Sequence, residues 1–312
     1  MNPCKAEPVF EGKNELGEGP VWDAGNRELV WVDIDGRTLW RWRPGDGRAG
    51  ASALDKKIGA AVPAKDGSWI LAMEDGFYRL EAGGRTILLA AVDEPDPENR
   101  LNDGKCDRSG RFWAGTMSAG GRKDGSLYVL EKGGTLAKKL TGVICSNGLA
   151  WNEEDTVMYY IDSGERKVFA FDYRPEDGAI ANRRTLIDFA AEGERGIPDG
   201  MTIDAEGMLW IAHWGGWQVS RWDPRTGRKL LSVSVPAKNV TSCTFGGDRL
   251  DELYITTARI GNDERELAGQ PLAGPSPPSA SGGRAGDGGP SPQPPPQSGA
   301  RNDLGRTRHP QQ

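Results

Sequence analysis

Leu29-Val30-Trp31-Val32 opens a series of six short apolar segments, each four residues long and rich in aromatic and branched side chains. The other five are Trp69-Ile70-Leu71-Ala72, Phe112-Trp113-Ala114-Gly115, Met158-Tyr159-Tyr160-Ile161, Leu209-Trp210-Ile211-Ala212 and Leu253-Tyr254-Ile255-Thr256. Short apolar runs of this composition predict buried β-strands. Their recurrence along the chain indicates an internal repeat, which decides the fold before any local detail.

Each segment follows a turn rich in Asp, Asn and Gly, for example Asp204-Ala205-Glu206-Gly207. In five copies a third strand and a weaker fourth strand come next. Asp, Asn and Gly supply the backbone conformations and local hydrogen bonds that tight hairpins need. Four antiparallel strands in a unit of roughly 40 to 50 residues are typical of a propeller blade. We therefore expect an all-β, six-bladed β-propeller with four antiparallel strands per blade, occupying residues 1–274.

A β-sandwich or a barrel also contains short strands at close spacing, but the register argues against both folds. One anchor position lies at a constant offset before the first turn of each unit, and the anchors are separated by 42, 42, 45, 52 and 42 residues. They are Glu18, Ala60, Asn102, Asn147, Asp199 and Thr241. A near-constant period is expected of propeller blades.

Composition and charge exclude several classes of partner and of catalytic site. The 312 residues carry a net charge of −6 without a block of Lys or Arg, so we do not expect a nucleic-acid partner. No signal-peptide core and no run of 18 apolar residues is present, which predicts a cytoplasmic protein without a membrane partner. We further expect a monomer. The two histidines, His213 and His309, are too few for a Ser-His-Asp triad or a multi-histidine metal site. The four scattered cysteines are interpreted as inert thiols.

The last repeat lacks its third strand after Ala273-Gly274. Residues 275–312 contain no aromatic residue, no Val and no Ile, and we expect a disordered Pro/Gly/Ser-rich tail. A Pro-rich ligand for a partner protein is the functional alternative. A shifted reading frame that replaced the final strands would also explain the change. The last blade is thus predicted to be incomplete, and the segment Pro8-Val9-Phe10-Glu11 is a candidate outer strand for it.

The anchors carry the chemistry that the sequence predicts. Inner strands of a propeller run along its central channel, so side chains at one register of successive blades converge at one mouth. Two bare carboxylates facing each other there would repel, and a cation resolves the repulsion. Oxygen donors of the Glu, Asn and Asp type suit Ca²⁺, Mg²⁺ or Mn²⁺. The alternative is that these residues only cap turns at strand starts.

Five stretches extend this interpretation: Leu16-Gly17-Glu18-Gly19-Pro20-Val21-Trp22, Arg100-Leu101-Asn102-Asp103-Gly104-Lys105, Gly115-Thr116-Met117, Ser146-Asn147-Gly148-Leu149-Ala150-Trp151 and Pro198-Asp199-Gly200-Met201. In this order they resemble the regucalcin (senescence marker protein)/gluconolactonase family. The resemblance implies a six-bladed propeller that hydrolyses a sugar lactone with one divalent cation, Ca²⁺, Zn²⁺, Mn²⁺ or Mg²⁺. It implies that Glu18, Asn147 and Asp199 bind the metal and that Arg100 and Asn102 bind the substrate.

From these roles we expect Asp199 to accept the proton of the attacking water, Arg100 to hold ring hydroxyls or the carboxylate product, and Asn102 to orient the sugar. The rival hypothesis is a calcium-binding or regulatory propeller without enzymatic activity. His213 is interpreted as a structural or second-sphere histidine, because no second histidine could pair with it. The recurring tryptophans are interpreted as core aromatics.

Overall fold

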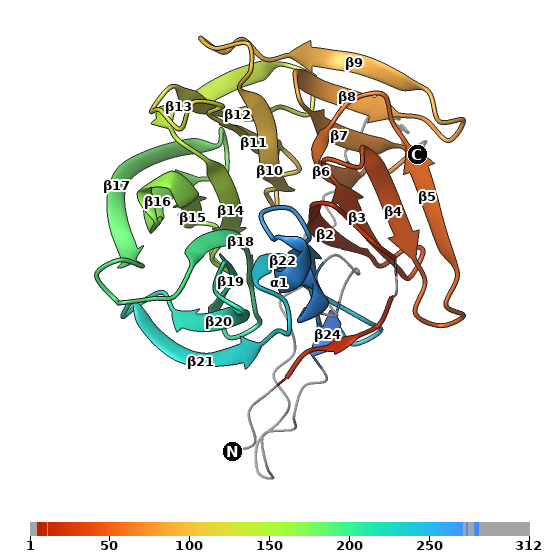
Figure 1. Cartoon of the computed structure of the whole chain (residues 1–312). Helices are drawn as coiled ribbons and strands as arrows, with labels where there is room; N and C mark the ends of the chain where they lie inside the picture. Colours follow the sequence, from red (N-terminus) through yellow and green to blue (C-terminus); the bar gives the residue numbers. More distant parts are fainter. Residues whose placement is uncertain (1–4, 11, 271–272, 274–277, 281–312) are drawn as a thin grey trace, which may run out of the picture.

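The computed structural model describes residues 5–10, 12–270, 273 and 278–280. Its strands form four-stranded antiparallel sheets arranged around a central axis, which is the architecture of a β-propeller (Figure 1). The innermost strands follow one another around the axis as β2, β6, β10, β14, β18 and β22, and each contacts the next. The all-β propeller predicted from the repeat is therefore confirmed.

Five sheets are blades built from four consecutive strands each. Blade one contains β2 (Gly17–Asp23), β3 (Glu28–Asp33), β4 (Thr38–Trp42) and β5 (Ala49–Ala53), and blade two contains β6 (Ile58–Pro63), β7 (Trp69–Met73), β8 (Gly76–Leu80) and β9 (Thr86–Ala91). Blade three contains β10 (Arg100–Cys106), β11 (Phe112–Met117), β12 (Gly125–Leu130) and β13 (Leu136–Val143). Blade four contains β14 (Ser146–Trp151), β15 (Val157–Asp162), β16 (Lys167–Arg174) and β17 (Ala179–Asp188), with the 3₁₀ turn η1 (Ser163–Glu165) between β15 and β16. Blade five contains β18 (Ile197–Ile203), β19 (Leu209–Trp214), β20 (Gln218–Asp223) and β21 (Arg228–Ser234).

The prediction of six blades of this kind is wrong, because the described part of the chain forms five of them. The remaining sheet joins β22 (Asn239–Gly246) and β23 (Glu252–Ala258) to the three-residue β24 (Pro278–Ala280) and the two-residue β1 (Glu7–Pro8). The sixth apolar segment lies in β23, and within the described residues the strands that complete this sheet contain only two and three residues. Residues 275–312 contain no aromatic residue, no Val and no Ile that a long outer strand could bury. The predicted absence of a third strand is also corrected, since β24 pairs with β23.

The outer strand of this sheet comes from the N-terminus, as the sequence suggested, but it is Glu7–Pro8, which pairs with Ser279 and Pro278. The predicted strand at residues 8–11 is therefore shifted. The proposed tail comprises residues 275–312, and all of it except residues 278–280 lies outside the described residues. Its predicted disorder therefore stays a prediction. The domain boundary at residue 274 stays a prediction.

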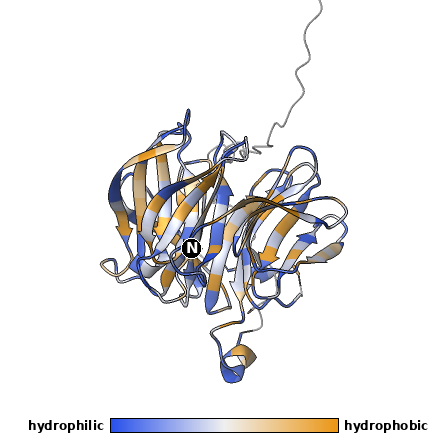
Figure 2. Cartoon of the chain, turned by 90° about the horizontal axis from the view of Figure 1, so that it is seen from above, coloured by the Kyte–Doolittle hydropathy of each residue, from blue (hydrophilic) through white to orange (hydrophobic). Residues whose placement is uncertain are grey.

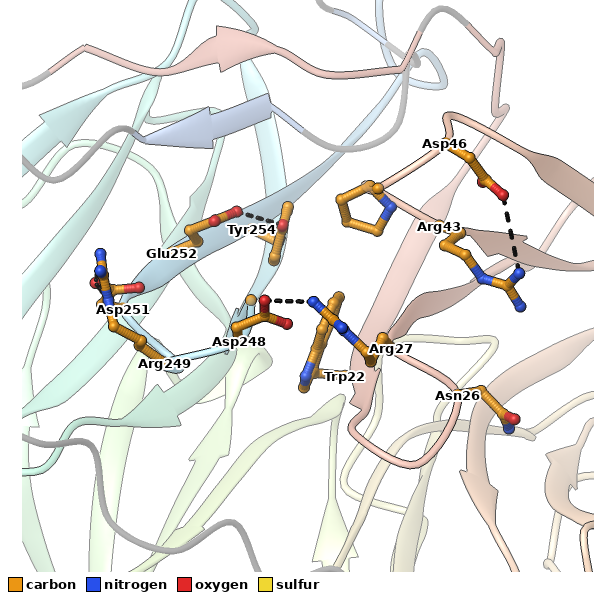
Figure 3. A pocket seen from close by; sticks show the side chains of 13 residues that line it. Trp22, Asn26, Arg27, Arg43, Asp46, Asp248, Arg249, Asp251, Glu252 and Tyr254 are labelled. Atoms are coloured by element: carbon orange, nitrogen blue, oxygen red, sulfur yellow. Dashed lines mark hydrogen bonds and ion pairs between the residues drawn. The ribbon is translucent and has the colours of Figure 1, made fainter.

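The first blade contacts the final sheet directly, so the ring is closed. At one end the Oγ1 of Thr241 donates a hydrogen bond to the carbonyl oxygen of Gly17 at 2.6 Å, and Leu16 forms a β-bridge with Ala258. At the other end the rings of Trp22 and Tyr254 stack with centroids 6.0 Å apart. Figure 3 shows this seam, where an ion pair between Arg27 and Asp248 spans a cavity of about 710 Å³.

The hydrophobic core is divided among the interfaces between neighbouring sheets. Between blades two and three, for example, Phe77 packs edge-to-face on Phe112 with ring centroids 5.4 Å apart. The tryptophans expected in the core are buried at Trp22, Trp31, Trp113 and Trp151 and half-buried at Trp210. Figure 2 shows apolar residues within the sheets and the short helix α1 (Glu264–Ala268) standing off one face. No helix within the described ranges is long and apolar enough to cross a membrane.

Candidate functional site

Every innermost strand contains a register shift at its anchor position. The shifts lie between Glu18 and Val21, Ile58 and Ala60, Leu101 and Gly104, Asn147 and Leu149, Pro198 and Met201, and Val240 and Ser242. A β-bulge of this kind redirects side chains away from the regular alternation of the strand and is common next to active sites. The bulges therefore turn one segment of each inner strand toward the channel. The anchors were predicted from the repeat, whereas the bulges were not.

Glycines let neighbouring inner strands approach at the bulges. A Cβ added to Gly148 would lie 2.6 Å from the Cβ of Met201 and 2.9 Å from the carbonyl oxygen of Asp199. A Cβ on Gly59 would lie 1.9 Å from the carbonyl oxygen of Asn102. All three distances are shorter than a van der Waals contact, and two of them involve backbone oxygens, so glycine is required at both positions. The close approach brings the anchors of adjacent blades together.

Hydrogen bonds connect the predicted substrate residues to a predicted metal ligand. Nη1 of Arg100 donates to Oδ1 of Asn102 at 2.7 Å. Nδ2 of Asn102 then donates to Oδ1 of Asn147 at 3.1 Å and to the carbonyl oxygen of Ser146 at 2.9 Å. Asn102 and Asn147 are both buried. The structure thus brings Arg100, Asn102 and Asn147 into one network across blades three and four.

Ser163, which the sequence analysis missed, extends this network to blade five. It is the first residue of η1 and is buried. Its Oγ accepts a hydrogen bond from Nδ2 of Asn147 at 2.8 Å and donates one to the carbonyl oxygen of Pro198 at 2.5 Å. Pro198 immediately precedes Asp199 in the chain. A single hydroxyl group therefore fixes the amide of Asn147 and the backbone next to Asp199.

Two buried aspartates position the segments that lead into the anchors. Asp33 accepts hydrogen bonds from the backbone N–H groups of Glu15, Leu16 and Gly36, each at 3.0 Å. Asp162 acts in the same way at the start of β14, where it accepts from Ile144 and Cys145 at 3.0 Å. Hydrogen bonds to an ionised acceptor are stronger than neutral ones. Each carboxylate therefore holds the chain two or three residues before a predicted metal ligand.

The carboxyl groups of Glu18 and Asp199 influence each other electrostatically. Burial, together with the charge of Asp103, raises the pKa of Glu18 from 4.5 to about 8, although hydrogen bonding to the N–H of Gly19 opposes this shift. Burial and the charges of Glu18 and Asp103 raise the pKa of Asp199 well above its usual value. Among the ion pairs of the described residues none includes Glu18 or Asp199, and the charge of Arg100 lowers the pKa of Glu18 less than burial raises it. Both groups are thus costly to ionise without a cation.

Asp103 is a third buried carboxylate near this pair, and the sequence analysis did not select it. One of its oxygens accepts a hydrogen bond from the N–H of Gly104 at 2.7 Å. Burial raises its pKa, and the positive charge of Lys105 opposes the shift. Since its charge raises the pKa of both Glu18 and Asp199, Asp103 lies close to both of them.

These side chains fit a divalent cation. Two buried carboxylates without a cationic partner and an amide oxygen form a donor set of hard oxygen atoms, which Ca²⁺, Mg²⁺ and Mn²⁺ prefer. The described part of the chain contains no group of three or more His, Cys, Asp and Glu side chains that could hold a metal ion. A site here therefore needs the amide of Asn147. The assignment of Glu18, Asn147 and Asp199 as metal ligands stays a prediction.

His213 and the described cysteines have the buried surroundings of structural residues. His213 is fully buried, its Nδ1 donates to the carbonyl oxygen of Arg195 at 2.9 Å, and its Nε2 accepts from the hydroxyl of Ser220 at 2.5 Å. Burial lowers its pKa, so the neutral ring predominates. The thiols of Cys106, Cys145 and Cys243 are free, and burial raises their pKa values. Cys4 and His309 lie outside the described residues.

Comparison with known proteins identifies the family. Residues 16–259 match the SMP-30/Gluconolactonase/LRE-like region. Regucalcin of Danio rerio is 42% identical to this chain over 277 residues, which cover 88% of this chain and 93% of the relative. The family match over residues 16–259 includes all the predicted metal and substrate residues.

Solved structures of related proteins have the same fold. A calcium-binding protein, regucalcin from Agrobacterium tumefaciens, superimposes with a TM-score of 0.84 and 28% identity over 89% of this chain and 94% of that one. A gluconolactonase from Xanthomonas campestris superimposes with a TM-score of 0.68 and 26% identity over 80% of this chain and 85% of that one. The resemblance inferred from the five sequence stretches is confirmed, and this chain belongs to the SMP-30/gluconolactonase/LRE-like family.

Proposed function

We propose that this protein hydrolyses a sugar lactone to the corresponding aldonic acid with the help of one divalent cation. The observation that carries the proposal is the pair of buried carboxyl groups, Glu18 and Asp199, beside the hydrogen-bonded chain of Arg100, Asn102 and Asn147. Membership of a family that includes gluconolactonases supports it. A binding protein would need the carboxylates but not a guanidinium group and an amide next to them.

Each of these residues has a separate role in the proposed ester hydrolysis. A divalent cation held by Glu18, Asn147 and Asp199 would polarise the lactone carbonyl and lower the pKa of a water molecule. Asp199 accepts the proton of the attacking water, and its burial beside the charges of Glu18 and Asp103 favours the protonated carboxyl group that results. Arg100 binds ring hydroxyls or the new carboxylate, because a guanidinium group can donate two parallel hydrogen bonds to a carboxylate. Asn102, held by Arg100, orients the sugar.

A second candidate function is calcium binding without catalysis. The regucalcin of Agrobacterium tumefaciens is described as a calcium-binding protein. The same three ligands would serve this function, so binding of Ca²⁺ alone does not separate the two candidates. Only turnover does.

The experiment measures acid release from glucono-, galactono-, xylono- and arabinono-lactones, with and without EDTA. We expect cation-dependent hydrolysis of at least one lactone, and loss of both turnover and cation binding in Asp199→Ala. Glu153→Gln, which removes an exposed charge in the turn before β15, is the control and should keep full activity. Full lactonase activity in Asp199→Ala would refute the assignment. Tight cation binding without hydrolysis of any lactone would favour the second candidate.

A further inference from the structure

The central channel contains a cavity of about 480 Å³ beyond the predicted metal site. All six innermost strands line it, from the bulge residue Gly19 to the hairpin turn at Asn26 in blade one and from Asp103 to Cys106 in blade three. Because inner strands begin at the end that carries the anchors, this cavity occupies the opposite half of the channel. Its volume lies in the usual range of small-molecule sites.

Two opposite charges lie in this cavity. Asp103 is 6% exposed, and its carboxylate accepts the N–H of Gly104. Lys105 donates a hydrogen bond from Nζ to the carbonyl oxygen of Met201 at 2.6 Å. Among the described contacts, Asp103 and Lys105 form no ion pair with each other within 4.0 Å. A carboxylate can accept about four hydrogen bonds and an ammonium group can donate three, so both groups keep capacity for a ligand.

The charged pair could be spanned by one small molecule. Residues two apart on an extended strand have Cα atoms roughly 7 Å apart. An ammonium and a carboxylate group on one carbon atom fit between charges at this separation. An isolated anion would be repelled by Asp103, and an isolated cation by Lys105. A ligand that carries both charges matches both side chains.

The walls of the cavity determine the rest of the ligand. They are mainly apolar and aromatic, with contributions from Trp22, Val62, Trp151, Ile203 and Phe245. Thr202, Ser242 and Thr244 add hydroxyl groups to the walls. The charged residues other than Asp103 and Lys105 lie at or beside the hairpin turns, for example Lys65 and Arg108. A ligand with its charges at Asp103 and Lys105 would therefore place an apolar group against these walls.

We propose that this half of the channel is a second ligand site, which binds a zwitterionic α-amino acid with an apolar side chain. The ammonium group of the ligand binds Asp103, its carboxylate binds Lys105, and its side chain lies between the apolar walls. This site is separate from the proposed lactonase centre and requires neither the divalent cation nor Arg100. Asp103 lines the cavity, and its charge also acts on Glu18 and Asp199.

Isothermal titration calorimetry tests the proposal with three probes of similar shape: L-leucine, 4-methylpentanoate and 3-methylbutylamine. We expect saturable binding of L-leucine, both with Ca²⁺ and in EDTA, at least tenfold tighter than that of either singly charged analogue. Charge-assisted hydrogen bonds account for a preference of this size. Lys105→Met should weaken L-leucine binding at least tenfold. Lys132→Met, which changes an exposed turn of the same blade, should leave it unchanged.

The probe series on the wild-type protein decides the question even if Lys105→Met fails to fold. Absence of saturable L-leucine binding would overturn the proposal. Equal binding of 4-methylpentanoate would reject a zwitterionic ligand and indicate a site for anions. Equal binding of 3-methylbutylamine would also reject it and indicate a site for cations. Loss of L-leucine binding in EDTA would place the ligand at the metal centre and also reject the second site. None of these results depends on lactonase activity, so the proposed function is tested separately.

Discussion

Replacing Ser163 by alanine removes one hydroxyl group that links two predicted metal ligands. The change leaves the amide of Asn147 without its 2.8 Å acceptor and the carbonyl oxygen of Pro198 without its 2.5 Å donor. An unsatisfied buried polar group costs about 1–3 kcal/mol. Two such groups give an expected loss of about 2–4 kcal/mol in the free energy of unfolding, allowing for the weak contact that Asn147 keeps with Sγ of Cys145.

The same substitution should weaken the site itself. Without Ser163 the amide of Asn147 keeps only the hydrogen bond from Asn102 and the weak contact with Sγ of Cys145, so its orientation is less restricted. We expect at least a tenfold loss of affinity for Ca²⁺ or Mn²⁺, because orienting partners of metal ligands typically contribute 10-fold to 100-fold in affinity. Calorimetric titration of the cation and urea denaturation in EDTA measure the two effects independently.

A matched control separates stability from positioning. Ser68 is another buried serine, and its Oγ donates to Asp66 at 2.6 Å in a turn of blade two. Ser68→Ala should lower the free energy of unfolding without changing cation affinity. If Ser163→Ala binds the cation as tightly as the wild-type protein does, Ser163 does not position Asn147, and the reasoning fails.

Three further predictions concern the carboxylates and the close approach of strands. In EDTA the free energy of unfolding should fall by up to a few kcal/mol as the pH rises from 4.5 through about 8, because the pKa of Glu18 is higher in the folded than in the unfolded protein. Urea denaturation at several pH values should show a smaller pH dependence of this free energy for Glu18→Gln. Asp33→Ala should lower the free energy of unfolding by about 3 kcal/mol, since it frees the N–H of Leu16 and two others, and thermal melts that match the wild type would contradict this. Gly148→Ala should destabilise the protein by about 2 kcal/mol or more and weaken cation binding, whereas Gly83→Ala, which meets no atom within 4 Å, should do neither; calorimetry of both variants checks this.

The repeating part of the fold could be predicted from the sequence because it is local. A four-residue apolar strand after an Asp- or Gly-rich turn carries its own pattern, and six copies of it are visible without knowledge of any contact. The resemblance that assigned Glu18, Asn147 and Asp199 also relies on short continuous stretches. Their neighbours Arg100 and Asn102 were found in the same way, and the structure places Asn102 in hydrogen-bond contact with Asn147.

The number of complete blades could not be predicted in this way. The second strand of a blade shows that a unit is present, but a complete blade also needs outer strands, and the final sheet takes these from distant parts of the chain. The short pairings of β1 and β24 contain two and three residues, too few to leave a recognisable pattern. Strand pairing between chain ends depends on tertiary contacts rather than on local propensity.

Ser163 escaped detection for a related reason. It lies in a short 3₁₀ turn without a counterpart in the other blades as far as the structure describes them, and serine is common in turns for local reasons. Its role arises only because η1 packs beneath the amide of Asn147 and beside Pro198. A residue that acts through two neighbours on other strands leaves no trace in the spacing of the sequence.

The bulge in blade three explains why Asp103 was also missed and why it matters. Between the pairs Leu101–Thr116 and Gly104–Ala114, two residues of β10 face a single residue of β11. A selection of one anchor per blade takes Asn102 and passes over Asp103. The corresponding bulge in blade one contains Gly19 and Pro20, and that in blade five follows Asp199 with a glycine, so neither adds a second polar side chain. Among these three bulges only that of blade three adds a second polar side chain, the carboxylate of Asp103. This carboxylate acts on Glu18 and Asp199 in one half of the channel and lines the cavity in the other half.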